Sequence, residues 1–161
     1  MQIRTYNVYK FDELTDEQKQ KAIDNLRDIN VDYDGCDYVD EDGAITLQQL
    51  DTYRGECDIE FTNSAEETAR YITANHGEHC DTYKTSKNFL DEYAKIEPLY
   101  IKGDESFDDL YSDLCQEYKN ELASDYLKIL RDDESYRYSD EAIIETIQAN
   151  DYDFTIDGKI D

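Results

Sequence analysis

Acidic residues recur at every fourth position in the second half of this 161-residue chain, beside an apolar row that starts at Leu110 and is expected to face the core. In a helix, this spacing puts carboxylates in one row about 6 Å apart, because each residue rises about 1.5 Å. Like charges so placed cost roughly 0.2–0.5 kcal/mol per pair. The row therefore predicts a surface that binds a positively charged partner, and its members are Asp109, Asp113, Glu117, Glu121 and Asp125.

A second acidic row alternates with apolar residues in the segment 56–61. In a strand, alternate side chains face opposite sides and recur about every 6.6 Å. Cys57, Ile59 and Phe61 would then face inward and the three acids outward. Nucleic-acid-binding proteins contact phosphates through Lys and Arg, so both rows could compete for such a basic surface, although charge runs also mark solvated faces. The partner-binding acids predicted in this segment are Glu56, Asp58 and Glu60.

The overall composition points to the same kind of partner. The chain has 41 acidic residues against 16 Lys plus Arg, a net charge of −25. This charge opposes direct binding to nucleic acid phosphates or anionic membranes. No run of about 20 apolar residues is present, and the N-terminus lacks the apolar segment of a secretion signal. We therefore expect an intracellular protein whose partners are basic proteins.

Residues 30–41 resemble a calcium-binding loop, with oxygen-bearing side chains at alternate positions, Gly35 at the turn and Glu41 at the last position. However, the first position is Asn30, and Asp37 stands where such loops usually have an apolar residue. We therefore predict no metal ligands and no cofactor, and we keep calcium binding as an alternative.

His76, His79 and Cys80 are close in sequence and are residue types that bind zinc, but no fourth ligand can be identified. The four cysteines include no CxxC pair and are predicted to be reduced, small core residues: Cys36, Cys57, Cys80 and Cys115.

Catalytic motifs are missing from the sequence. It has no nucleophile with a paired base, no Gly-rich phosphate loop and no metalloprotease helix. Among so many acids, a close carboxylate pair carries almost no information about acid–base catalysis. The chain is therefore predicted not to be an enzyme.

Patterns of capping and periodicity predict an α+β fold: a small antiparallel sheet packed against about five helices, in a single domain over 1–161. A chain of this length is expected to bury a single core. Capping boxes at Thr15 with Gln18 and at Ser64 with Glu67 begin two of the helices. Ser106 and Ser139 are predicted to cap two more. The predicted helices cover 16–29, 65–77, 80–96, 106–130 and a segment after 139, and the predicted strands lie at 3–11, 45–47, 57–61 and 152–156. The two middle strands are expected to turn near Arg54 and Gly55, and the first and last strands could pair in one sheet.

Several tyrosines stand near acids and could add contact area, because Tyr is enriched in binding hot spots. Most tyrosines at helical spacing are nevertheless core residues. The candidates are Tyr33, Tyr38, Tyr111, Tyr136 and Tyr138.

Three segments, at 5–34, 75–84 and 125–159, resemble a family of small acidic proteins encoded in phages and prophages. The similarity includes FDEL at 11–14 and SDEAIIETI at 139–147. It implies a phage setting, in which small acidic proteins often act as anti-CRISPR proteins or DNA mimics. Charge and resemblance together predict a counter-defence inhibitor in the host bacterial cytoplasm that binds a nuclease or CRISPR effector. An antitoxin that neutralises a basic toxin is the alternative binding protein.

Overall fold

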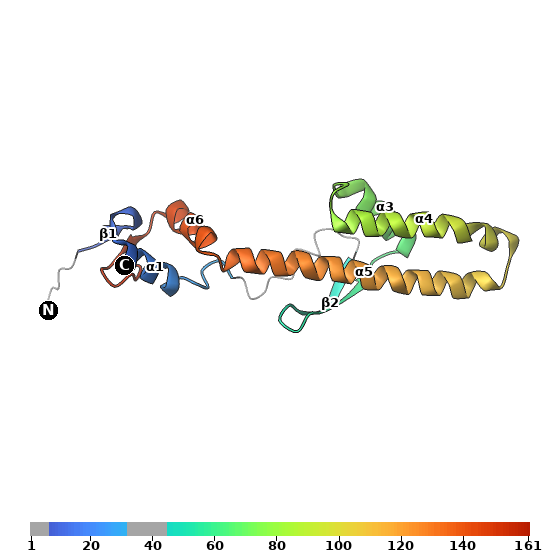
Figure 1. Cartoon of the computed structure of the whole chain (residues 1–161), viewed down its shortest axis with the longest axis horizontal. Helices are drawn as coiled ribbons and strands as arrows, with labels where there is room; N and C mark the ends of the chain where they lie inside the picture. Colours follow the sequence, from blue (N-terminus) through green and yellow to red (C-terminus); the bar gives the residue numbers. More distant parts are fainter. Residues whose placement is uncertain (1–6, 32–44) are drawn as a thin grey trace. The chain divides into compact units, whose positions relative to one another are not determined.

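A computed structural model describes residues 7–31 and 45–161 (Figure 1). The α+β class is confirmed, since these residues form five α-helices and two antiparallel two-stranded sheets. The chain divides into two compact units, a larger unit of residues 34–131 and a smaller unit of residues 1–33 with 132–161. The assignment of the whole chain to one domain remains a prediction.

Buried apolar residues form two clusters, one in each unit, whereas the sequence predicted a single core. The reason lies in the longest helix, α5 (Ser106–Arg137), whose last buried residue is Leu130. The segment 131–137 is mostly polar and has no buried residue, so the apolar row of α5 ends with the core of the larger unit.

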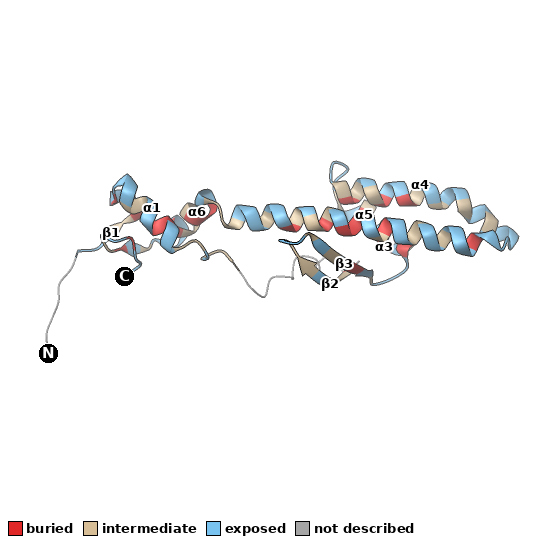
Figure 2. Cartoon of the chain, turned by 60° about the horizontal axis from the view of Figure 1, so that its bottom comes forward, coloured by how far each residue is buried: buried red, intermediate tan, exposed pale blue. Residues whose placement is uncertain are grey.

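The larger unit combines a strand hairpin with a helical hairpin. Strand β2 (Ile45–Asp51) pairs with β3 (Glu56–Phe61), and α3 (Ala65–Asn75) packs on α4 (Asp81–Lys102). Figures 1 and 2 show α4 along one side of α5 and the sheet along another. The predicted strands and their turn at residues 54–55 are confirmed.

Helix α4 extends six residues beyond its predicted end at residue 96 and includes Pro98. Packing explains the extension: Leu99 is half-buried, and the ring of Tyr100 lies 5.1 Å from that of Phe107 on α5. Ser106, predicted as a cap, is instead the first residue of α5, and the carboxylate of Asp104 accepts bonds from its N–H at 3.0 Å and its hydroxyl at 2.7 Å.

Aromatic rings connect the two helices of the hairpin. Consecutive ring centroids along this chain of side chains are 4.4–6.3 Å apart, within the range of favourable aromatic pairs. Together the rings hold α5 in place against α4 and β3. In order they are Phe61, Tyr118, Phe89, Tyr93, Tyr111, Phe107 and Tyr100.

The smaller unit brings segments from both ends of the chain together. Its elements are β1 (Tyr9–Lys10), the 3₁₀ turn η1 (Phe11–Glu13), α1 (Asp16–Asn25), α6 (Asp140–Asn150) and β4 (Asp153–Phe154). Strands β1 and β4 pair antiparallel, which confirms the expectation that the first and last strands join.

Three predicted elements in this unit are longer than the observed ones. The predicted strand 3–11 starts outside the described residues, and β1 ends at Lys10 because Phe11 is buried at the start of η1. The predicted strand 152–156 is reduced to β4, Asp153–Phe154. Helix α1 ends at Asn25, where the side-chain amide of Asn25 donates to the carbonyl of Gly158 at 2.9 Å. Turns follow α1 in place of its predicted last residues.

Candidate protein interface

The acidic row of α5 forms as predicted over most of its length. Asp109, Asp113, Glu117 and Glu121 are exposed, and no Lys or Arg in the described segments forms an ion pair with them. Asp125 differs, because it is partly buried and accepts a hydrogen bond from the Thr85 hydroxyl at 2.7 Å. Four consecutive carboxylates are therefore available to a partner, and the fifth joins α5 to α4.

The apolar row beside these acids is buried only in part. Tyr118, Leu122, Tyr126 and Leu130 are buried, Leu114 is half-buried, and Leu110 is exposed. The prediction that Leu110 faces the core is wrong. Phe107 occupies the buried position at this end of the helix and stacks on Tyr111.

The β3 row has the predicted orientation but carries less free charge. Ile59 is buried and Glu56, Asp58 and Glu60 are exposed, which confirms the alternation. However, Asp58 lies 3.1 Å from the ammonium of Lys119 on α5, and Glu56 accepts a bond from the Gln49 amide at 3.0 Å. Internal contacts therefore occupy two members of this row.

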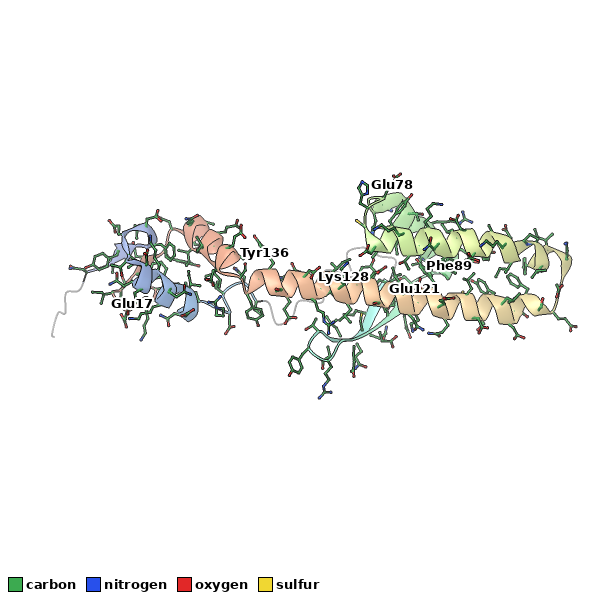
Figure 3. All side chains as sticks on the ribbon, viewed as in Figure 1. Glu17, Glu78, Phe89, Glu121, Lys128 and Tyr136 are labelled. Carbon is green, nitrogen blue, oxygen red and sulfur yellow. The ribbon has the colours of Figure 1, made fainter. Side chains whose placement is uncertain are left out.

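The two rows lie on opposite sides of α5. Asp58 lines a cavity together with Lys119 and Ala123, whereas Glu117 and Glu121 line a groove of about 330 Å³ against α4. Since each residue turns a helix by about 100°, positions 117 and 119 are on different faces. Figure 3 labels Phe89 and Glu121, which both line the groove. The rows do not form one continuous acidic surface.

Acidic charge is concentrated on one helix of the hairpin. Residues 106–127 of α5 carry six acids and one base, Lys119, which is paired with Asp58. In contrast, α4 carries four acids and four lysines. Three of these lysines form ion pairs with acids of the same helix: Lys84 with Asp81, Lys87 with Asp91, and Lys95 with Glu92. A role in solubility alone would not require α5 to carry more net negative charge than the adjacent α4.

Burial raises the pKa of Asp125 above its usual value of 3.8, and the bond from Thr85 opposes the shift. Because the folded-state pKa is the higher one, the ionised carboxylate destabilises the fold at neutral pH. That penalty fades as the pH falls through the folded-state pKa toward 3.8.

Asp125→Asn keeps an acceptor for Thr85 and removes the charge. We expect it to leave stability at neutral pH unchanged or raised by at most about 1 kcal/mol. It should also flatten the pH dependence of the melting temperature above pH 3.8, as thermal unfolding over a pH series would measure. Asp109→Asn, at an exposed site, is the control. A clear loss of stability at neutral pH for Asp125→Asn would contradict the burial penalty.

The tyrosine candidates have mixed outcomes. Tyr111 is half-buried, its hydroxyl donates to Glu66 at 2.7 Å, and burial raises its pKa, so it is mainly a packing residue. Tyr136 is exposed and donates to Glu145 at 2.9 Å, and Tyr138 is half-buried. Tyr33 and Tyr38 lie outside the described residues. The sequence prediction missed three more exposed tyrosines: Tyr53 in the strand turn, Tyr71 on α3 and Tyr100 at the end of α4.

The cysteine prediction is partly wrong. Cys57 and Cys115 are half-buried against the larger core, but Cys80 is exposed at the position preceding α4. An N-terminal helix boundary rather than a core site explains its exposure. Cys36 is not among the described residues.

Neither metal alternative gains a site from the described residues. Residues 32–41 of the calcium-like loop lie outside them, and His76 Nδ1 lies 2.7 Å from the Thr82 hydroxyl. Within 7–31 and 45–161, no three His, Cys, Asp or Glu side chains are placed to hold a metal ion. No helix in the same ranges is long and apolar enough to cross a membrane.

Comparison of the chain with protein-family models, curated proteins and solved structures gives no match. The most distinctive feature of the chain's own surface is the row Asp109, Asp113, Glu117 and Glu121, which we call the α5 acidic row.

Proposed function

We propose that this chain is a phage-encoded counter-defence inhibitor of the anti-CRISPR or DNA-mimic type. In this proposal, the α5 acidic row binds the basic nucleic-acid-binding surface of a host nuclease or CRISPR effector. The observation that carries it is that four exposed carboxylates follow one helix without a cationic partner in the described chain. The phage setting and the class of target come from the sequence resemblance.

The charge density of the row indicates how such binding would work. The row has one charge per about 6 Å of helix, against one per about 3.4 Å on a single DNA strand. One helix therefore supplies roughly half the linear charge of one strand. This favours a helix that fills a basic groove over a full replica of a duplex. The net charge of −25 adds long-range attraction, which salt screens beyond about 8 Å.

Rigidity supports binding by the same helix. Tyr118, Leu122 and Tyr126 are buried on the inner side of α5 and fix the backbone that carries the row. Binding then costs less ordering entropy than it would for a flexible acidic tail. The β3 row faces another side of α5 and has two members in internal contacts, so we assign the primary contact to α5 alone.

The test replaces three members of the row, in Asp113→Asn/Glu117→Gln/Glu121→Gln. We expect this triple variant to bind a purified host effector at least about tenfold more weakly at low salt, since tenfold corresponds to about 1.4 kcal/mol. Affinity would be measured by calorimetry against a panel of guide-loaded CRISPR effectors and restriction nucleases. The fold should persist, because the substitutions relieve like-charge repulsion along the helix.

A matched control removes the same charge from exposed acids of the smaller unit, in Asp28→Asn/Asp132→Asn/Glu134→Gln. This control should change affinity less than about threefold, through the net charge alone. Equal losses in the two triple variants would reduce the effect to net charge and overturn the assignment to the α5 acidic row. Binding to a basic toxin in place of every effector would favour the antitoxin alternative.

A further inference from the structure

We propose that the tip of the α4–α5 hairpin is a second, apolar contact with the same partner, and that it docks on an amphipathic, basic helix. The tip comprises Tyr100, Ile101 and Leu110. This inference rests on the proposed function, because the tip adjoins the α5 acidic row. It adds a component of binding that salt does not screen.

The tip exposes large apolar side chains. Tyr100 is 66% exposed, Ile101 76% and Leu110 45%. Single exposed apolar residues are ordinary on protein surfaces. Here, however, the last turn of α4 and the second turn of α5 present three of them at one end of the hairpin, which Figure 2 colours mostly as exposed. Grouped apolar residues among charges are typical of interaction sites.

The backbone of the tip is ordered without a partner. Gly103 adopts a left-handed φ of +68°, and its N–H donates to the carbonyl of Tyr100 at 3.0 Å. The N–H of Asp104 donates to the carbonyl of Leu99 at 3.0 Å, which completes a helix-terminating pair of bonds. The ring of Tyr100 packs on buried Phe107. Docking would therefore require little further ordering.

Charge around the tip selects the occupant. Four acids next to it are exposed, and only one base, Lys102, belongs to the same turn. A second copy of this chain would bring two such acidic tips and two net charges of −25 together. A helix with Leu on one face and Lys or Arg beside it is complementary in both respects. The four acids are Asp104, Glu105, Asp108 and Asp109.

The experiment uses a synthetic peptide of about 14 residues with Leu on one helical face and Lys on the other, and a second peptide with Ser in place of Leu. We expect the intact chain to bind the Leu/Lys peptide, but not the Ser/Lys peptide, at about 300 mM salt, where exposed charges are screened. Ile101→Ser/Leu110→Ser should weaken this binding about tenfold. Tyr53→Ser, at an exposed site in the strand turn, should leave it unchanged.

Two results would overturn the proposal. One is equal affinity of the tip variant and the intact chain for the Leu/Lys peptide, with circular dichroism showing both folded. The other is a dimer of the chain alone, seen in sedimentation and abolished by the tip variant, since the occupant would then be a second copy. If only the tip variant gives a contradicting result, the assignment of the α5 acidic row is unaffected. An error in that assignment would appear in the effector assay with the triple variant.

Discussion

Tyr118→Ala is expected to lower the free energy of unfolding by about 3–5 kcal/mol, the range for truncating a large buried aromatic ring. Tyr118 is only 2% exposed. Its ring centroid lies 4.4 Å from that of Phe89 on α4 and 5.3 Å from that of Phe61 on β3. The substitution removes the ring that joins both elements to α5. Urea unfolding followed by far-ultraviolet circular dichroism measures the loss.

Tyr118→Phe separates the contribution of the hydroxyl from that of the ring. The hydroxyl lies 2.8 Å from that of buried Ser86, and burial raises its pKa to about 12, so it stays protonated. Its removal leaves the Ser86 hydroxyl unpaired at a cost of about 1–3 kcal/mol. Tyr53→Ala, at a residue 96% exposed, should have little effect. If Tyr118→Ala and Tyr53→Ala were equally mild, the aromatic packing of the hairpin would be contradicted.

Gly158→Ala is expected to destabilise the smaller unit by about 2–4 kcal/mol, the sum of backbone strain and overpacking. Gly158 has a φ of +76°, a backbone conformation that residues other than glycine rarely adopt. A Cβ there would lie 2.7 Å from the backbone nitrogen of Ala22 and 3.0 Å from the carbonyl carbon of Lys21. Because both atoms belong to the backbone of α1, α1 and the final turn would have to move apart.

Gly103→Ala is the matched control for Gly158→Ala. Its φ of +68° is similar, but no atom lies within 4 Å of the added Cβ. Only the conformational penalty of about 1 kcal/mol applies there. The difference between the two variants, measured by urea unfolding, isolates the close approach of the final turn to α1. Equal losses of unfolding free energy in the two variants would mean that the short distance between the final turn and α1 does not constrain the fold.

Local rules predicted much of this fold. The capping boxes at Thr15 and Ser64 form in the structure, as does the cap at Ser139. Alternation on β3 and the four-residue period of α5 also hold, because each depends only on neighbours along the chain. Even the pairing of the first and last strands follows the sequence prediction, since both contain aromatic residues suited to a sheet.

Long-range contacts explain what the sequence pattern missed. Packing of the tilted Tyr100 ring against Phe107 extends α4 past Pro98, and Phe107 rather than Leu110 occupies the core position at this end of α5. Likewise, the ion pair of Lys119 with Asp58 joins residues 61 positions apart. The sequence predicts the period of each acidic row, but the side of α5 on which each row lies depends on tertiary packing.

Competition for one purified, guide-loaded effector between this chain and a labelled DNA duplex tests the central claim most directly. The proposal predicts that the chain displaces the duplex completely, and that raising the salt from about 50 to 200 mM weakens the chain's own binding. The triple variant of the α5 acidic row should displace the duplex only at much higher concentration. A ternary complex, in which the effector holds the chain and the duplex together with undiminished affinity for each, would contradict the claim.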